Sequence, residues 1–338
     1  MAGRSTALKV GGIAAGASVA LAGLGYGIGR AAVARDRRRP DPDAGDPFLP
    51  PYDEAIDVAT HDGRRLHAIV RGRGQPVVLL HGMSLSVRTW VKQLEALPED
   101  GFRVVAFDHR GHGGSEGGED GLTLEDLAED VRAVLERLDL RDAVLVGHSL
   151  GGVVVQAFAV RFPQVAEQRV SGLVLLSTVA RTQISGAPGL QRIVAGLFDR
   201  APDPAGIVRH RNLGFLLARV GFGREPRASH VELAREMIAE CRGAVTRGAT
   251  RALLGVDLTG DLPRVAIPVR VVCGSADVLS PPAESRRLAR LLPDARLVVL
   301  DGGGHMLMLE RAEELDRLVA AFAREVSRVR TASGEGAP

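Results

Sequence analysis

Residues 143–160, AVLVGHSLGGVVVQAFAV, contain an apolar strand, a tight turn and an apolar helix in that order. The turn Gly147-His148-Ser149-Leu150-Gly151 follows the pattern G-x-S-x-G, in which the serine lies on a sharp bend between a strand and a helix. The flanking glycines avoid side-chain clashes at such a bend, and the helix N-terminus beside Ser149 favours negative charge. The bare pattern often arises by chance, but here a strand precedes it and a helix follows it. We therefore predict that Ser149 is a nucleophile exposed above a sheet.

Extended and helical segments alternate along the chain from about residue 54 onward. Several extended runs are almost entirely apolar, such as PVVLL at 76–80 and VRVVCG at 269–274. Such runs are typical of strands that are covered on both faces in a parallel sheet. We predict an α/β fold with a doubly wound, mostly parallel eight-stranded sheet. The predicted strands are Ala55–Thr60, Arg65–Arg71, Pro76–His81, Arg103–Asp108, Ala143–Gly147, Gly172–Ser177, Val269–Gly274 and Arg296–Leu300.

An insertion interrupts this alternation between the sixth and seventh predicted strands. Residues 180–263 are helix-like, interrupted by glycines and rich in arginine, and no strand–helix repeat can be drawn through them. A segment of this size at the C-terminal edge of the sheet would lie above the site, so we predict a helical cap. The main domain, with the cap included, is expected to span residues 54–330, and residues 331–338 to form a flexible tail.

A serine nucleophile needs a base, and the base is in turn oriented by an acid. The sequence Gly302-Gly303-Gly304-His305 follows the last predicted strand, and its glycines give the loop freedom to bring an imidazole over the sheet. Two other histidines, His81 and His148, lie beside the site but on the turns around it, and the remaining six do not follow a C-terminal strand. We predict that His305 is the base; the alternative is that it merely ends a loop.

The acid is expected on the loop after the preceding strand, where the sequence reads Gly274-Ser275-Ala276-Asp277. Asp277 could instead only cap this turn. Asp301 is a rival, but it lies too near His305 in sequence to reach the far nitrogen of the imidazole easily. We predict Asp277 as the acid, which gives the chain order Ser, Asp, His that this architecture requires.

Negative charge that develops on a substrate oxygen needs backbone N–H donors. One donor is expected at Leu150, the residue after the nucleophile. The other is expected on the turn His81-Gly82-Met83 after the third strand, with Met83 preferred over Gly82. We place His81, Gly82 and His148 beside the substrate, with His81 holding the loop rather than transferring a proton. The alternative is that His81 and Gly82 simply end a strand.

Five motifs together resemble the α/β-hydrolase fold superfamily, and above all its branch of esterases, monoacylglycerol lipases, cofactor-free haloperoxidases and epoxide hydrolases. They are HGM at 81–83, DHRGHGGS at 108–115, GHSLGG at 147–152, GSADVLSPP at 274–282 and GGGHMLMLE at 302–310. The resemblance covers about residues 55–329 and is weakest in the cap. It implies the roles assigned above to Ser149, Asp277, His305, Met83 and Leu150. It also implies that Asp108 is structural and bonds local backbone.

One departure from part of that family narrows the chemistry. Epoxide hydrolases and dehalogenases carry aspartate as the nucleophile, whereas this chain has Ser149, so we expect acyl transfer. The expected activity is hydrolysis of a carboxylic ester, which could be lipid-like if the N-terminal segment holds the enzyme at a membrane. A haloperoxidase of the perhydrolase type or an acyltransferase would use the same residues. A non-catalytic ligand-binding member is the remaining alternative.

Composition limits the partners. The net charge is +2, aromatic residues make up 4% of the chain, and no basic stripe with interleaved aromatics points to nucleic acid. No metal and no organic cofactor is expected, and the partner is a small-molecule ester. The sequence leaves the acyl group and the oligomeric state open.

The first 39 residues form a separate hydrophobic segment. Val10 to Gly29 is uncharged and long enough for a bilayer-spanning helix. As an anchor it would make the protein membrane-associated, with the catalytic domain in the cytoplasm because the heavier positive charge follows the segment. As a signal peptide it could be cleaved after Ala32-Val33-Ala34 and the protein secreted, although Arg30 and Arg35 count against cleavage. The third alternative is a weakly apolar extension that never inserts; the anchor is preferred.

Residues 40–53 are rich in proline and aspartate, so they are not expected to form a regular helix or strand. We predict a linker that separates the catalytic domain from the first 39 residues.

Overall fold

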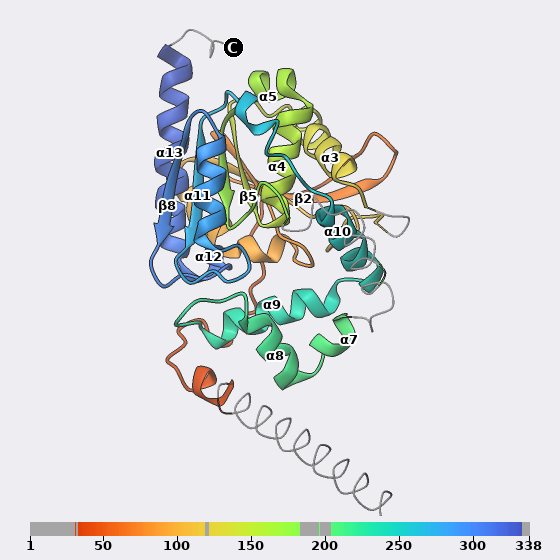
Figure 1. Cartoon of the computed structure of the whole chain (residues 1–338), viewed down its shortest axis with the longest axis vertical. Helices are drawn as coiled ribbons and strands as arrows, with labels where there is room; N and C mark the ends of the chain where they lie inside the picture. Colours follow the sequence, from red (N-terminus) through yellow and green to blue (C-terminus); the bar gives the residue numbers. More distant parts are fainter. Residues whose placement is uncertain (1–30, 32, 119–121, 183–195, 197–203, 333–338) are drawn as a thin grey trace, which may run out of the picture.

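The computed structural model describes residues 31, 33–118, 122–182, 196 and 204–332. The eight predicted strands are all present, with ends that differ by no more than two residues from the prediction (Figure 1). They are β1 (Glu54–Ala59), β2 (Arg65–Arg71), β3 (Gln75–Leu80), β4 (Phe102–Phe107), β5 (Ala143–His148), β6 (Val170–Leu176), β7 (Val269–Gly274) and β8 (Ala295–Leu300).

These strands form one sheet in the order β1-β2-β4-β3-β5-β6-β7-β8. The pairs β1/β2 and β2/β4 are antiparallel, and every later pair is parallel. The carboxyl ends of β3, β5, β7 and β8 therefore meet at one edge of the sheet. Because the predicted site loops follow these four strands, the topology gathers them at that edge.

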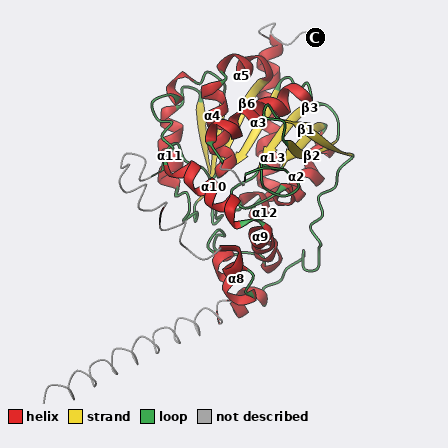
Figure 2. Ribbon diagram, turned by 90° about the vertical axis from the view of Figure 1, so that its right-hand side faces the viewer, coloured by secondary structure: helices red, strands yellow, loops and turns green. Residues whose placement is uncertain are grey.

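Alternate side chains of each parallel strand enter two cores, one on each face of the sheet. In β3, Val77 and Leu79 pack in the core that contains α2 and α13, whereas Val78 and Leu80 pack in the core that contains α3 and α4. Helices thus cover both faces, and the predicted doubly wound architecture is confirmed (Figure 2). The helices of this domain are η1 (Val87–Trp90), α2 (Val91–Ala96), η2 (Leu97–Asp100), α3 (Leu124–Arg137), α4 (Leu150–Arg161), α5 (Pro163–Arg169), η3 (Leu262–Arg264), α11 (Pro282–Leu291), α12 (Leu307–Glu310) and α13 (Ala312–Ala332).

The last helical stretch of the chain is divided into two helices. A short helix, α12, ends at Glu310, and α13 then begins at Ala312 and runs to Ala332. Arg311 lies between them with φ −134° and ψ 42°, which is not helical. The backbone bend places α13 along the sheet, where its apolar face covers β6.

The predicted helical cap after the sixth strand is also confirmed. Its described helices are α7 (Pro204–Val208), α8 (Arg211–Arg219), α9 (Ala228–Glu240) and α10 (Gly243–Leu254). Figure 1 shows α7, α8 and α9 at one end of the sheet domain, with α10 leading back toward it. Residues 183–195 and 197–203 of the predicted cap lie outside the described residues.

Residues 40–53 contain turns and no regular helix or strand, but they are packed rather than free. The carboxylate of Asp43 contacts His230 of α9 at 2.8 Å and Lys92 of α2 at 3.3 Å. Phe48 is buried, and its ring lies edge-on to His230 with 5.6 Å between centroids. This segment therefore ties the cap to the main domain instead of only separating two parts of the chain.

The expected membrane anchor is corrected. Within the described part of the chain, no helix is both long enough and apolar enough to cross a membrane. We therefore withdraw the transmembrane helix and the membrane-associated location. The stretch Val10 to Gly29, on which both depended, lies outside the described residues.

Candidate active site

Ser149 lies at the bend between β5 and α4, with φ 53° and ψ −113°. A positive φ is uncommon for a residue with a side chain, and such strain persists only where the surroundings enforce it. Here the Ser149 N–H donates to the carbonyl of Leu176 at 3.0 Å. The hydroxyl of Thr178 donates to the Ser149 carbonyl at 2.7 Å. Two contacts with the end of β6 thus hold the serine backbone in its strained form.

Glycine is required on both sides of this bend because backbone atoms approach closely there. A Cβ atom on Gly147 would lie 2.5 Å from the carbonyl oxygen of Gly151. A Cβ atom on Gly151 would lie 2.3 Å from the carbonyl oxygen of Leu80 at the end of β3. Either side chain would push α4 away from the sheet, so the spacing of the motif has a steric cause.

The predicted acid and base meet above the same edge of the sheet. His305 Nδ1 lies 3.0 Å from Asp277 Oδ2, although 28 residues separate them. The other oxygen, Oδ1, accepts the backbone N–H groups of Leu279 and Ser280, each at 2.9 Å. Burial acts to raise the pKa of Asp277, but the hydrogen bonds from His305 and Ser280 outweigh it and lower the pKa to about 2. Asp277 is therefore a carboxylate at neutral pH, and it fixes the imidazole with Nε2 on the opposite side of the ring.

Ser280 is a member of this arrangement that the sequence analysis did not identify. Its hydroxyl donates to Asp277 Oδ2 at 2.8 Å and lies 3.1 Å from His305 Nδ1. Its side chain is buried. The signal in the sequence was weak, because a serine three residues after an aspartate is common in turns that only cap themselves.

The turn after β3 packs directly against the nucleophile. A Cβ atom on Gly82 would lie 2.8 Å from His148 Nδ1 and 3.3 Å from Ser149 Cβ, so only glycine fits there. Met83 follows Gly82 and lines the same cavity as Ser149. Leu150 is the first residue of α4. Met83 thus shares the cavity with Ser149, and Leu150 follows Ser149 directly; their role as N–H donors stays a prediction.

His81 lies behind this turn rather than in the cavity. It is fully buried, and its Nε2 accepts the backbone N–H of His109 at 3.0 Å, while its Nδ1 donates to the carbonyl of Gly82 at 2.7 Å. In return, His109 Nε2 donates to the carbonyl of His81 at 3.0 Å. Burial holds the pKa of His81 well below its ordinary value and lowers that of His109 to about 3. These neutral rings brace the turn, and His81 does not reach the substrate side.

His148 lines the cavity and also supports the base. Its Nε2 donates to the carbonyl of His305 at 3.0 Å, and the two rings lie edge to face with 4.7 Å between centroids. Burial, followed by the proximity of His305, keeps the pKa of His148 well below its ordinary value. A neutral ring at this position leaves a single imidazole to take up a proton beside Ser149.

A second support for the base comes from the cap, and the sequence analysis missed it. The N–H groups of His305 and Met306 both donate to the carbonyl of Gly221, at 2.8 and 3.1 Å. The N–H of Gly223 donates to the carboxylate of Glu310 at 2.6 Å, and that carboxylate also accepts from Met306. The loop after α8 therefore helps to hold the backbone that carries His305. No local pattern in the cap sequence could have paired it with a loop about eighty residues later.

A cavity of about 280 Å³ joins these parts. Ser149 and His305 both line it, and its lining among the described residues contains no Asp, Glu, Lys or Arg. Its walls are mostly apolar side chains, namely Met83, Leu85, Leu217, Ala218, Ala234, Ile238, Leu279 and Met306. A larger hollow of about 710 Å³ includes the first residues of β6 and β7, at the opposite edge of the sheet, and contains none of the predicted site residues. We assign the smaller cavity as the site because it holds the reactive groups.

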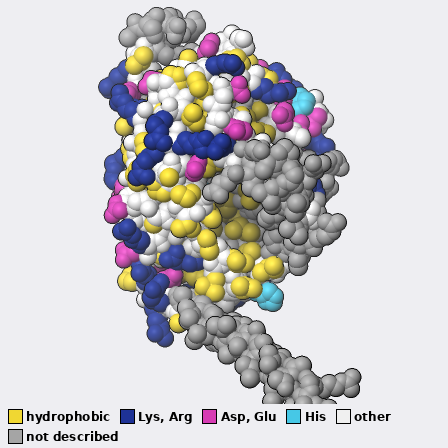
Figure 3. All heavy atoms as spheres, in the orientation of Figure 1, with side chains coloured by type: hydrophobic (Ala, Val, Ile, Leu, Met, Phe, Trp, Pro, Cys, Tyr) yellow, Lys and Arg dark blue, Asp and Glu magenta, His cyan; other side chains and the backbone are white. Residues whose placement is uncertain are grey.

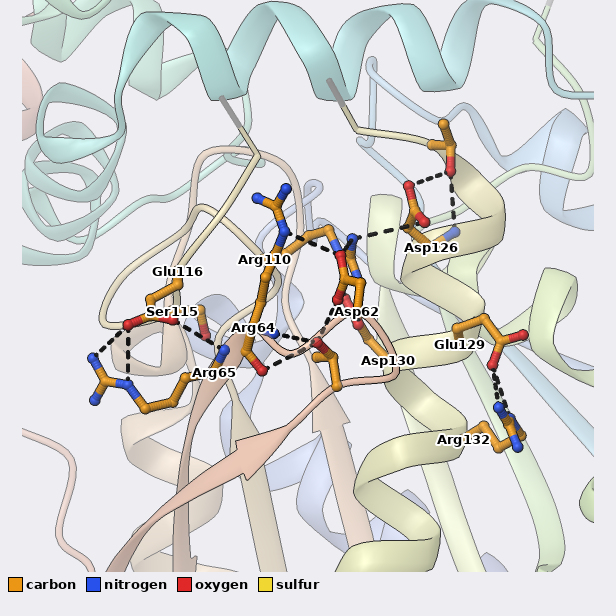
Figure 4. Close-up of polar contacts among 12 residues, drawn as sticks. Asp62, Arg64, Arg65, Arg110, Ser115, Glu116, Asp126, Glu129, Asp130 and Arg132 are labelled. Carbon is orange, nitrogen blue, oxygen red and sulfur yellow. Dashed lines mark hydrogen bonds and ion pairs between the residues drawn. The ribbon is translucent and has the colours of Figure 1, made fainter. Parts of the chain in front are cut away.

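The loop after β4 is held in place by buried polar side chains. Asp108 is buried and accepts the backbone N–H groups of Val87 at 2.8 Å and Gly114 at 2.9 Å, which agrees with the structural role implied by the resemblance. Arg110 does not line the cavity and forms a bidentate pair with Asp130 of α3, at 2.7 and 2.6 Å (Figure 4). This pair fastens the loop to the helix layer. Nowhere in the described residues do three or more His, Cys, Asp or Glu side chains gather as a metal site would require.

The chain is similar to known proteins over most of its length. The family described as "alpha/beta hydrolase fold" matches residues 75–312. The non-heme chloroperoxidase CPO-A1 of Kitasatospora aureofaciens is 31% identical over 259 residues, which cover 73% of this chain and 90% of that protein.

Two solved structures extend the comparison. A thermophilic esterase from Thermogutta terrifontis superposes with a TM-score of 0.67 at 30% identity, covering 81% of this chain and 99% of the esterase. An esterase from Exiguobacterium antarcticum has a TM-score of 0.71 and covers 80% of this chain and 100% of its own. At 22% identity, this second likeness concerns the fold.

Proposed function

The chain belongs to the α/β-hydrolase fold family, and within it we propose a serine hydrolase that cleaves a carboxylic ester through an acyl-enzyme on Ser149. One observation carries the proposal. A serine held at φ 53° beside a helix N-terminus shares an apolar cavity with His305, whose other nitrogen is bonded to the carboxylate of Asp277. This is the arrangement that nucleophile, base and acid need in acyl transfer.

In the first half of the reaction, Ser149 Oγ attacks the ester carbonyl carbon while His305 Nε2 takes the hydroxyl proton. The carbonyl oxygen becomes an oxyanion, and the backbone N–H groups of Met83 and Leu150 are the proposed donors that stabilise it. Asp277 stabilises the imidazolium that forms. The imidazolium then returns its proton to the departing alkoxide, so an alcohol leaves and the acyl group stays on Ser149.

In the second half, water attacks the acyl-enzyme. His305 takes a proton from that water as the O–C bond forms. The imidazolium then gives this proton to Ser149 Oγ as the second tetrahedral intermediate collapses, which releases a carboxylic acid and restores the Ser149 hydroxyl. The lining of the cavity supports an uncharged substrate, because its described residues include no Lys or Arg that could pair with an anionic one.

Hydrolysis of p-nitrophenyl butyrate tests this proposal. We expect release of p-nitrophenol that saturates with substrate and is abolished by prior treatment with a serine-reactive fluorophosphonate. Absence of turnover with butyrate and with acetate, hexanoate and phenyl esters would contradict the assignment as an esterase.

A second candidate is a cofactor-free haloperoxidase, and the likeness to non-heme chloroperoxidases favours it. In this reaction, hydrogen peroxide replaces water as the nucleophile that attacks the acyl-enzyme. The acyl group leaves on the peroxide oxygen as a peracid, which oxidises halide outside the protein. An acyltransferase would differ again, with an alcohol as the second nucleophile.

The two candidates are separated by supplying acetate, hydrogen peroxide and bromide and following bromination of monochlorodimedone. A hydrolase is expected to show ester turnover far faster than bromination at equal enzyme concentration. Bromination that rivals ester turnover, and that disappears without acetate, would favour the second candidate.

We predict that Ser280 positions the acid–base pair for this reaction. Its hydroxyl shares Asp277 Oδ2 with His305 and thereby spreads the negative charge that faces the imidazole. In Ser280→Ala that charge acts on His305 alone, so the acid limb of the pH profile of kcat/KM is expected to move to higher pH. A fall in kcat of about 10- to 100-fold should accompany the shift, because one hydrogen bond to a charged group is worth roughly 1.5–3 kcal/mol.

The control is Ser280→Thr, which keeps the hydroxyl and should restore the position of the acid limb. An acid limb that stays in place in Ser280→Ala would mean that the residue only packs. The neighbouring titratable groups that face this pair, His148, Cys273 and Glu310, are the same in all three proteins, so they cannot produce the difference.

A further inference from the structure

One cap helix that lines the cavity, α8, exposes an apolar stripe. Leu213, Leu217 and Val220 follow one another at intervals of four and three residues, so they lie on one face of α8 and at its end. Their side chains are 48%, 46% and 49% exposed, whereas Phe215 and Ala218 on the other face are buried. A surface helix normally turns its apolar side chains toward the core. Helix α8 differs, because it has apolar side chains on an exposed face as well as on a buried one.

A second exposed apolar pair belongs to the loop that carries the acid. Val278 and Leu279 follow Asp277 directly, and their side chains are 65% and 55% exposed. This pair lies beside the stripe, because a Cβ atom on Gly221, which follows Val220, would lie 3.9 Å from Leu279 Cδ1. Elements from the cap and from the main domain therefore present one apolar surface, and Figure 3 shows apolar side chains gathered where the two parts meet on that face.

This surface is continuous with the cavity that holds Ser149. Leu217 and Leu279 both line the cavity while about half of each side chain is open to solvent. We define the apolar rim as Leu213, Leu217, Val220, Val278 and Leu279. Exposed apolar patches that border a cavity are typical of ligand-binding grooves.

We propose that the apolar rim is a subsite for the far end of a long, uncharged hydrocarbon chain of the ester substrate. This inference rests on the proposed function, because cleavage at Ser149 fixes where the ester group must sit. The cavity of about 280 Å³ lies at the small end of ligand pockets, which run from about 300 to 1,000 Å³. A chain longer than the cavity can leave it past Leu217 and Leu279, which line it and are about half exposed, and the rim offers it an apolar surface with no charge among its five side chains.

The test measures kcat/KM for two series of esters, kept below the concentrations at which they aggregate. In p-nitrophenyl alkanoates the chain lengthens on the acyl side, and in alkyl acetates it lengthens on the alcohol side. The rim variant is Val220→Ser/Val278→Ser, chosen because neither residue lines the cavity. The matched control is Leu49→Ser/Val299→Ser, two exposed apolar residues outside both cavity and rim.

In one of the two series, the wild type should have a higher kcat/KM for dodecyl than for butyl chains. The rim variant should lower this ratio of kcat/KM values by about fivefold or more, since each methylene left in water forfeits part of about 0.8 kcal/mol. The control should keep the wild-type ratio. The series that responds tells whether the acyl or the alcohol chain occupies the rim.

An unchanged ratio of long-chain to short-chain kcat/KM in both series would overturn the proposal. If the rim variant instead changed the protein's mass by light scattering while leaving the ratios intact, the occupant would be a second copy of the chain, which also overturns it. Failure of the proposed function looks different, because then no ester of any length would be turned over.

Discussion

Replacing Ser149 by alanine is expected to lower kcat/KM for p-nitrophenyl butyrate by about 10⁴-fold or more, because the acyl-enzyme can no longer form. His305 and Asp277 keep their contact in this variant, so the loss measures the nucleophile and not the collapse of the site. Initial rates with highly purified protein check it, since traces of wild type would mask a loss of this size.

The control measures whether the variant still folds as the wild type does. Alanine keeps the strained backbone at φ 53°, so the free energy of unfolding of Ser149→Ala should stay close to that of the wild type. Ser149→Gly is equally inactive in this account, but it should be more stable than Ser149→Ala because glycine adopts that conformation with less strain. Residual activity within tenfold of the wild type in either variant would contradict the role of Ser149.

Replacing Arg110 by methionine is expected to lower the free energy of unfolding by about 3–5 kcal/mol at pH 8, because it leaves a buried carboxylate unpaired. Asp130 is fully buried, and Arg110 is 3% exposed and bonded to both of its oxygens. Burial raises the pKa of Asp130, and the hydrogen bonds from Arg110 work against that rise. Without the guanidinium the carboxylate binds a proton more readily when folded than when unfolded, so stability should recover as the pH falls. Urea unfolding at pH 8 and pH 5 measures both effects.

Two control variants test the cause of this expected loss of stability. Arg132→Met removes the partner of Glu129 in an ion pair on the same helix, α3, where the Arg132 side chain is 33% exposed (Figure 4). It should lower the free energy of unfolding by less than about 1 kcal/mol. Arg110→Met/Asp130→Leu removes both buried charges and should recover most of the loss, since no unpaired charge remains. Equal costs for Arg110→Met and Arg132→Met would refute the idea that the buried pair fastens the loop.

The sequence was sufficient for the parts of this molecule that local patterns determine. Apolar runs such as those of β3 and β7 marked strands buried on both faces, and the glycines around Ser149 marked a bend that only they allow. Because the site loops follow parallel strands, the meeting of His305 with Asp277 could be predicted from chain order and topology.

The features that could not be predicted from the sequence depend mostly on contacts between distant segments. The residues from 40 to 53 have the composition of a free linker, yet Asp43 binds Lys92 and His230, which lie 49 and 187 residues away. The loop at Gly221 holds His305 through backbone groups, which carry no sequence signal. The anchor was inferred from the length and the lack of charge of Val10 to Gly29, which lie outside the described residues.

The most direct measurement of the central claim is the covalent state of Ser149. The full-length protein is treated with a fluorophosphonate, digested, and mapped by mass spectrometry. We expect one phosphonate per chain, located on the peptide that contains Ser149, with labelling slowed in His305→Gln and absent in Ser149→Ala. A wild-type protein that stays unlabelled, as a non-catalytic ligand-binding member would, or that carries the label on another residue, would contradict it.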